Sequence, residues 1–243
     1  MKMQNNMLSK KGKLYLIPTT LGEIDPIATI PAQVYSVIND IDEYLVENEK
    51  WARQYLKKLG IKKPLQEIIL HPLNKHTSST ELSLSMKCLS EGKNLGIISE
   101  AGCPGIADPG ADAVKIAHQN NIEVVPLVGP SSILLALMAS GFSGQSFAFH
   151  GYLPIERSER VKKIKDLEKL AITQHQTQLF IETPFRNNHM VEDLLKHCQP
   201  QTLLCIAVDI TLPTEMIKTK TVVEWKKNIP ELHKRPAIFL LYK

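Results

Sequence analysis

The sequence predicts an α/β protein of two domains, with a mainly parallel sheet in the first and a mixed sheet in the second. Through residues 1–148, short apolar runs alternate with segments of helical spacing, which is typical of right-handed βαβ units. After residue 148 the apolar runs alternate less regularly with helical segments, which favours a mixed sheet. We therefore expect domains at 1–148 and 149–243.

In the first domain, apolar runs predict five strands, and the spacing of apolar residues predicts helices after them. The expected strands are 13–18, 44–46, 67–70, 95–98 and 123–127, and the expected helices are 34–41, 51–59, 79–89, 112–118 and 133–139. Either Ser131 or Ser132 can cap the last helix, and Gly141 can end it.

In the second domain the strands are expected at 146–149, 177–182, 203–208, 216–223 and 236–242, and the helices at 157–170 and 187–197. Residues 150–154 are the expected joint between the domains. Helix 157–170 carries Arg157, Arg160, Lys162, Lys163 and Lys165, which could bind phosphates. Acidic residues alternate with them, so the pattern favours a solvated helix face.

The chain is organised around residues 94–110, where a buried strand runs into a turn rich in glycine and proline. Asp108 before Pro109 has the pattern of a helix N-cap followed by proline at the first helical position. Ligands bind at such strand ends in open α/β sheets, although a tight crossover also needs Gly and Pro for its geometry alone. The turn matches neither a Walker loop nor a dinucleotide fingerprint.

Composition excludes several classes of protein. Among 243 residues, 43% are apolar and 22% charged, as in ordinary globular proteins, and no apolar run reaches the roughly 18 residues of a membrane span. The four cysteines form no C-x-x-C pair and the histidines no H-E-x-x-H motif, so we expect no metal and a reduced, cytoplasmic setting. Residues 1–13 have no apolar core of a secretory signal and are expected to be a disordered lead-in.

Charge divides unevenly along the chain. The first 148 residues carry 14 Lys/Arg and 14 Asp/Glu, whereas the remainder carries 15 and 11, so the whole net charge of +4 falls in the second domain. A mildly basic domain is compatible with nucleic acid, although such charge is often a solvated surface.

Three motifs in order resemble the tetrapyrrole-methylase superfamily, the class III S-adenosylmethionine-dependent methyltransferases: the strand ended by Pro18, the stretch 99–110, and the turn 128–132. The Gly-Cys-Pro…Asp-Pro-Gly turn resembles the branch that methylates a cytidine ribose 2′-oxygen in small-subunit ribosomal RNA. The resemblance covers residues 14–242.

The resemblance implies two α/β domains with S-adenosylmethionine in a cleft between them, and usually a homodimer. It also implies cofactor contacts at Pro18, Gly102, Cys103, Pro104, Ile106, Ser131, Ser132, Ile181, Glu182, Ile210, Pro236 and Ala237. The branch typically has Glu-Asp-Thr-Arg where this chain has Glu47-Asn-Glu-Lys50, and Pro-x-Gly-Asn where it has Leu21-Gly-Glu23. Glu182-Thr-Pro-Phe-Arg186 keeps both ends of the branch's Glu-Ser-x-x-Arg.

These residues leave the catalytic group open. A base would help if the acceptor is a ribose hydroxyl, and Glu182, Asp108 and Glu100 are the candidates, although Asp108 also fits a helix cap. Arg186 is the predicted substrate contact. We expect a methyltransferase acting on RNA, with the ribosomal small subunit as a possible partner and no membrane. The alternatives are a tetrapyrrole or other small-molecule acceptor, or a protein that binds the cofactor without turnover.

Overall fold

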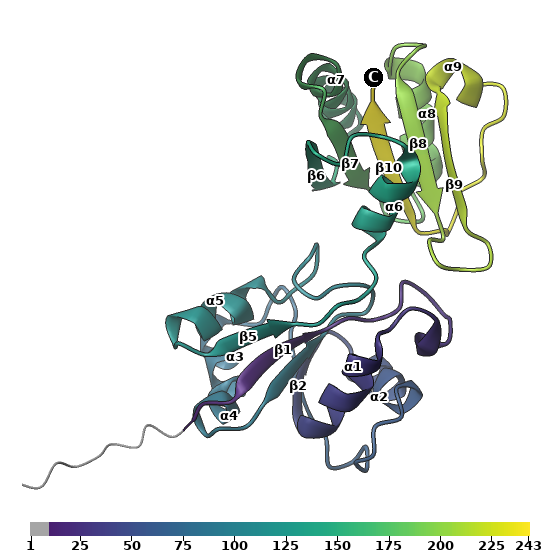
Figure 1. Cartoon of the computed structure of the whole chain (residues 1–243). Coiled ribbons are helices and arrows are strands. Elements are labelled where there is room, and N and C mark those ends of the chain that lie inside the picture. Colours follow the sequence, from purple (N-terminus) through teal and green to yellow (C-terminus); the bar gives the residue numbers. More distant parts are fainter. Residues whose placement is uncertain (1–9) are drawn as a thin grey trace, which may run out of the picture. The chain divides into compact units, whose positions relative to one another are not determined.

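The computed structural model describes residues 10–243, so most of the predicted lead-in at 1–13 lies outside the described residues. The chain divides into two compact units, the first ending at Pro130 and the second beginning at Ser131 (Figure 1). In the part of the chain from residue 10 onward, no helix has the length and apolar character needed to cross a membrane.

The first unit is a parallel five-stranded sheet in the order β3-β2-β4-β1-β5. Its strands are β1 (Lys13–Ile17), β2 (Glu43–Val46), β3 (Ile69–Pro72), β4 (Leu95–Ile98) and β5 (Glu123–Pro126). Its helices are α1 (Ala32–Val37), α2 (Glu49–Lys58), α3 (Ser79–Ser85), α4 (Lys87–Ser90) and α5 (Ala111–Gln119), with 3₁₀ turns η1 (Pro26–Ala28) and η2 (Ile38–Asp40).

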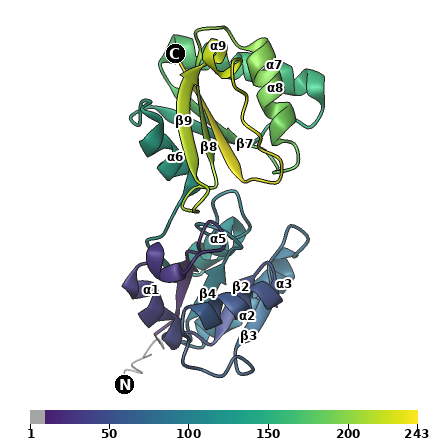
Figure 2. The same cartoon turned by 90° about the vertical axis from the view of Figure 1, so that its right-hand side faces the viewer.

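Helices cover both faces of this sheet (Figures 1 and 2). On one face Val34 of α1 and Leu56 of α2 pack with Ile17 of β1 in a buried cluster. On the other, Leu82 of α3 and Ala113 of α5 pack with Leu14 of β1. The buried strand β4 is apolar throughout because both of its faces are covered.

The second unit is a mixed sheet in the order β6-β7-β10-β8-β9, in which only β6 and β7 are parallel. Its strands are β6 (Phe147–Tyr152), β7 (Thr177–Ile181), β8 (Leu203–Val208), β9 (Met216–Thr221) and β10 (Ala237–Tyr242). Its helices are α6 (Ser132–Ser140), α7 (Arg157–Gln174), α8 (Asn187–His197) and α9 (Val222–Trp225). Helices α7, α8 and α9 bury one face against the sheet, and α6 lies on the other (Figure 2).

Contacts assign α6 to the second unit, whereas the sequence placed the domain boundary after residue 148. Helix α6 packs on β9 and β10, and Thr219 Oγ1 donates to the Ser140 carbonyl at 2.7 Å. The expected joint at 150–154 is largely strand, because β6 continues to Tyr152 and His150 hydrogen-bonds Gln178 of β7 at 2.7 Å.

The expected fold class is confirmed, and several element boundaries differ. Strand β3 begins two residues later than expected, and the helix predicted at 79–89 is divided at Met86 into α3 and α4. The strand predicted at 216–223 ends at Thr221, whose hydroxyl caps α9 in a capping box.

The largest difference concerns Asp108, which is not the cap of α5. Gly110 occupies that position with φ of 140°, and the helix begins at Ala111. A Cβ built on Gly110 would lie 3.2 Å from the Gly105 nitrogen, so the loop closes on itself directly before the helix. This closure prevents Pro109 from serving as the first helical residue and leaves the Asp108 carboxylate free for another role.

Candidate functional site

The loops that follow β1 and β4 meet at the carboxyl-terminal edge of the parallel sheet. These two strands are neighbours, yet the next α-helix after β1 is α1 on one face and the next after β4 is α5 on the other. Adjacent loops that leave in opposite directions define the topological switch point of an open α/β sheet, where ligands bind. The organising stretch of the sequence is one of these two loops.

Backbone contacts join the three sequence motifs at this edge. Thr19, directly after Pro18, donates its N–H to the Gly102 carbonyl at 2.8 Å. A Cβ on Gly129 would lie 2.0 Å from the Pro18 Cβ, so only glycine fits there. The Cys103 thiol lies 3.4 Å from the Pro130 carbonyl. The structure therefore brings Pro18, Gly102 and Cys103 together, and their contact with a cofactor stays a prediction.

The turn after β4 presents backbone and one apolar side chain to the surroundings. Gly102 and Gly105 have φ of 75° and 79°, values that suit glycine. Pro104 is buried beneath the turn, whereas the Ile106 side chain is 52% exposed. An apolar side chain on such a backbone cradle fits the expectation that Ile106 lies against a ligand, and the contact itself stays a prediction.

Three carboxylates gather at the same edge. Glu47 follows β2 and Glu100 follows β4, and the Glu100 N–H donates to Glu47 Oε1 at 3.4 Å. Burial raises the pKa of half-buried Asp108 to about 6, and the negative charges of Glu47 and Glu100 add to the shift. Burial also raises the pKa of Glu47. A carboxylate with a pKa near 6 can accept a proton at neutral pH.

In the second unit, five of the predicted cofactor residues lie at one edge of the mixed sheet. Ile181 pairs with Ile238 at the start of β10, directly after Pro236 and Ala237. Asp209, the residue before Ile210, donates its N–H to the Pro236 carbonyl at 3.0 Å. The ends of β7 and β8 and the start of β10 therefore bring Ile181, Glu182, Ile210, Pro236 and Ala237 into one group.

Glu182 in this group is committed to an ion pair. Its carboxylate is 1% exposed and accepts from Arg186 Nη2 at 2.6 Å and Nε at 3.0 Å. It also accepts the Thr183 N–H at 2.6 Å. These three bonds occupy the carboxylate, so Glu182 is a weaker candidate for the base than Asp108. Arg186 remains 28% exposed on its side chain, and its predicted substrate contact stays a prediction.

Ser131 and Ser132 open α6, where the sequence placed them. Ser131 occupies the N-cap position in an extended conformation, but its hydroxyl makes no capping bond to the helix. Both side chains are only partly buried. The expected side-chain cap is therefore absent, and the position at the helix start is confirmed.

Sequence reasoning missed the strained loop after β8. Asp209 and Thr211 both have positive φ, 51° and 72°, without being glycine. Asp209 is held by Arg235 at 2.8 Å and by Thr214, while the buried Thr211 Oγ1 lacks a partner among the described residues. Strain and an unpartnered hydroxyl beside Ile210 are typical of a ligand-binding loop. The residue types alone carried no signal of this.

Helix α7 also differs in detail from the solvated face that its charges suggest. Arg160 is 7% exposed and, together with Arg157, binds the buried Asp193 of α8, at 2.7 Å and 2.9 Å. These two arginines fasten α7 to α8. Among residues 10–243, no cluster of His, Cys, Asp and Glu side chains is arranged to hold a metal ion.

The chain belongs to the Tetrapyrrole (Corrin/Porphyrin) Methylases family, whose model matches residues 13–225, and it is a methyltransferase. Among its relatives, a "Ribosomal RNA small subunit methyltransferase I" of Buchnera aphidicola (subsp. Schizaphis graminum) is 30% identical over 239 residues, covering 97% of this chain and 80% of that protein. The protein of the same name from Thermotoga maritima is 33% identical, covering 76% and 78%.

Solved structures share the fold. The methyltransferase CobJ superposes with a TM-score of 0.63 at 17% identity, covering 96% of this chain and 94% of that one. Uroporphyrin-III-C-methyltransferase from Thermus thermophilus superposes with a TM-score of 0.54 at 18% identity, covering 96% and 92%. The two-unit α/β architecture is thus that of the family.

Proposed function

We propose that the protein binds S-adenosylmethionine and transfers its methyl group to a ribose 2′-oxygen of small-subunit ribosomal RNA. The observation that carries the proposal is the meeting of Pro18, Gly102 and Cys103 at the switch point of the sheet. Family membership supports the cofactor, and the names of the relatives support the acceptor.

The residues present fit such a cofactor. The loop after β4 combines left-handed backbone at Gly102 and Gly105 with the exposed apolar Ile106, and an apolar surface of this kind suits the methylene groups beside a sulfonium. In the second unit, Thr211 Oγ1 beside Ile210 is an unpartnered buried hydroxyl among the described residues that a polar part of the cofactor could satisfy. When bound, S-adenosylmethionine supplies a methyl group already activated on a sulfonium.

The chain's own contribution is to position the acceptor and to take its proton. Positioning two reactants in line accounts for much of the rate in such displacements. A ribose hydroxyl must lose its proton as its oxygen attacks, and Asp108, with a pKa of about 6, is mostly charged at pH 7 and able to accept it. As the ribose oxygen bonds to the methyl carbon, the carbon–sulfur bond of the cofactor would break to release the neutral demethylated thioether, and the hydroxyl proton would pass to the Asp108 carboxylate.

Incubation with labelled S-adenosylmethionine and total cellular RNA, followed by nucleoside analysis, tests this proposal. We expect label in a 2′-O-methylated nucleoside, with chelator present, and a rate that falls steeply as salt rises because neutralised phosphates release counterions. Label that appears only in an added tetrapyrrole, with a flat salt dependence, would contradict the RNA acceptor and favour the small-molecule alternative.

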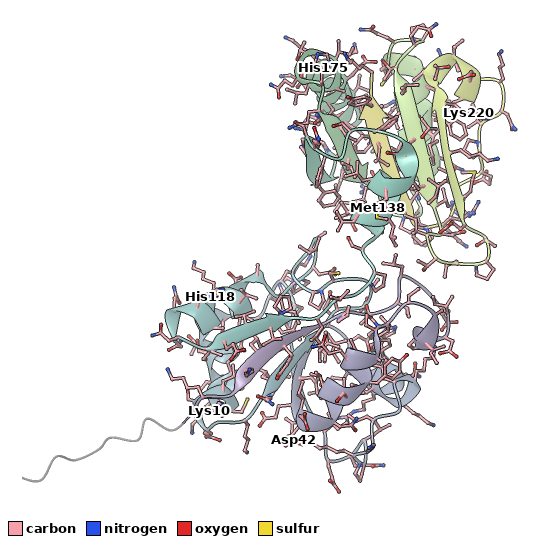
Figure 3. The ribbon with its side chains drawn as sticks, in the orientation of Figure 1. Lys10, Asp42, His118, Met138, His175 and Lys220 are labelled. Carbon is pink, nitrogen blue, oxygen red and sulfur yellow. The ribbon has the colours of Figure 1, made fainter. Side chains whose placement is uncertain are left out.

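We further propose that the protein works in the cytoplasm as a homodimer, as the family resemblance implies. All four cysteines, Cys88, Cys103, Cys198 and Cys205, are free, which suits a reducing compartment. On α6, Leu134 and Met138 are 52% and 78% exposed, and a partner surface would cover such apolar side chains. Met138 is labelled in Figure 3. Light scattering would report a mass of one chain if the dimer does not form.

A further inference from the structure

A small pocket in the first unit lies next to the switch point, at the ends of β1 and β4. Its volume is about 180 Å³, and it is lined by the loop after β1 (residues 20–23), one side of α2, and Glu100 and Ala101 after β4. Helix α2 presents Trp51, Gln54 and Lys58 to it, residues spaced three and four apart along one stripe of the helix. None of these three residues is among the cofactor contacts that the motifs predict.

Trp51, the first residue of this stripe, stacks on the aromatic ring of Tyr55. The rings of Trp51 and Tyr55 lie 5.1 Å apart, centroid to centroid, and are inclined by 13°. Tyr55 is buried, and its hydroxyl donates to the Pro18 carbonyl at 3.0 Å. Trp51 is only partly buried, with one part packed on the apolar cluster and another part lining the pocket. The core thus holds Tyr55 rigidly under Trp51, and this places an aromatic platform at the end of β1.

The polar groups of the pocket surround this platform. Lys58 and Gln54 are exposed on α2, and among the described residues neither side chain forms an ion pair or hydrogen bond within the protein. Glu23 and Glu100 also line the pocket, each with an exposed carboxylate. These groups can bind a nucleotide. Its base stacks on the aromatic ring, its phosphate pairs with the ammonium group, and the edge of the base hydrogen-bonds to the polar side chains.

We propose that this pocket receives one unpaired base of the RNA acceptor, which extends the Trp51–Tyr55 stack. The inference rests on the proposed function and names where the substrate binds. Lys58 meets the phosphate of that nucleotide, and Glu100 accepts a hydrogen bond from an exocyclic amino group, so bases that carry one bind better than uracil. A volume of about 180 Å³ is below the roughly 300–1,000 Å³ of pockets that enclose drug-sized ligands, which favours a single base over a macrocycle.

Tryptophan fluorescence reports on this pocket because Trp51 lines it and the sequence has one other tryptophan, Trp225. Trp225 is buried in the second unit, 2% exposed, with its indole N–H donating to the Leu204 carbonyl at 2.8 Å. The protein is first saturated with the demethylated cofactor and then titrated with a short single-stranded oligoribonucleotide. The oligoribonucleotide should quench the fluorescence of Trp51. The quenching should persist in a Trp225→Phe variant. RNA binding without quenching would overturn the inference.

Variants test the platform by affinity. Trp51→Ala should weaken oligoribonucleotide binding about tenfold, the order of loss when a stacked base loses its aromatic partner, and Trp51→Phe should retain most of the affinity. Tyr152→Ala is the matched control, since Tyr152 is an aromatic side chain 58% exposed on β6, outside the pocket. Equal RNA affinity for Trp51→Ala and wild type would overturn the proposal. If Tyr152→Ala lost as much RNA affinity as Trp51→Ala, the loss would not be specific to the pocket, and the proposal would also be overturned.

The outcome for the pocket can be separated from that for the reaction. If RNA is methylated but Trp51 is neither quenched nor required, the pocket inference fails and the proposed function stands. If no RNA is methylated while an oligoribonucleotide still quenches Trp51, the proposed acceptor fails and the pocket is supported. Quenching by a tetrapyrrole in place of RNA would overturn both. If Trp51→Ala does not fold, two measurements decide the question: quenching of Trp51 in the wild-type chain and the RNA affinity of Trp51→Phe.

Discussion

Asp108 links the stability of the first unit to the chemistry proposed for it. Its pKa of about 6 lies above the 3.8 of an unperturbed aspartate because burial and two neighbouring carboxylates disfavour its charge. The unfolded chain therefore loses this proton at lower pH than the folded chain does. The free energy of unfolding must then fall as pH rises from about 4 to about 6. A charged Asp108 at neutral pH is thus retained at a cost in stability, as expected of a functional group.

Replacing Asp108 with Asn should remove that cost. We expect the free energy of unfolding at pH 7 to rise by on the order of 1 kcal/mol, a value reduced for solvent screening of a half-exposed group. The gain should disappear below about pH 4, where Asp108 is protonated in both states. Urea titrations at both pH values measure this. Asp112→Asn, an exposed position on α5, should show no gain at pH 7, and a gain in Asp108→Asn that is independent of pH would contradict the explanation.

Arg186 raises a different question at the residue scale, because it neutralises Glu182. Arg186→Ala would leave a carboxylate of 1% exposure without its cation, so we expect a loss of about 2–3 kcal/mol in the free energy of unfolding. Adding Glu182→Gln to this variant should recover most of the lost free energy of unfolding. If the double variant is as unstable as the single one, the ion pair is not the source of the cost. The double variant also provides a folded protein in which the predicted RNA contact of Arg186 can be assayed.

At the scale of elements, the packing of Gly129 on Pro18 holds the turn after β5 against the end of β1. A Cβ at Gly129 would lie 2.0 Å from Pro18 Cβ, so Gly129→Ala must push the two turns apart. We expect a loss of about 1–3 kcal/mol in denaturant titrations, the usual cost of overpacking. Gly144→Ala is the matched control, because a Cβ there meets nothing within 4 Å and should change stability little. Equal losses in both variants would contradict the packing argument.

Regular elements could be predicted from the sequence where one local signal dominated. The apolar run of β4 and the helical spacing of α8 gave their observed bounds, because a strand covered on both faces and an amphipathic helix leave clear periodicities. The start of α5 could not be predicted, because the closure of Gly110 on Gly105 overrides the local Asp-Pro signal. The strained Asp209 contacts Arg235 and the Pro236 carbonyl, which are distant in sequence, so local sequence patterns could not indicate its conformation.

At the scale of the whole molecule, the two sheets were predictable and the division between them was less so. The alternation of strands and helices indicated one parallel and one mixed sheet, which the structure confirms. Helix α6 followed a parallel-sheet strand in sequence and was therefore assigned to the first domain. Its apolar residues instead pack on β9 and β10, which come about 80 to 100 residues later, a pairing that local periodicity cannot report.

The grouping of candidate site residues followed from the motifs only in part. The family resemblance implied that Pro18, Gly102 and Cys103 contact one cofactor, and the structure brings the three residues together. The carboxylate group of Glu47, Glu100 and Asp108 required the lateral order β2-β4, which the sequence does not specify. The sequence also gave no sign that Arg186 is held by Glu182, since both were considered separately for substrate and base.

The central claim is that the turn after β4 binds S-adenosylmethionine, and calorimetry on two glycine variants tests it most directly. Gly102 and Gly60 share a left-handed backbone, with φ of 75° and 71°, so alanine costs each a similar amount, about 1–2 kcal/mol of strain. Gly60 ends α2 with nothing within 4 Å of an added Cβ, whereas Gly102 is buried at the switch point, where an added Cβ would lie 3.3 Å from Leu21 Cδ2. With chelator present, wild type and Gly60→Ala should bind S-adenosylmethionine alike, and Gly102→Ala should lose most of its affinity. Equal binding by all three, or no heat with wild type at high micromolar ligand, would contradict the account.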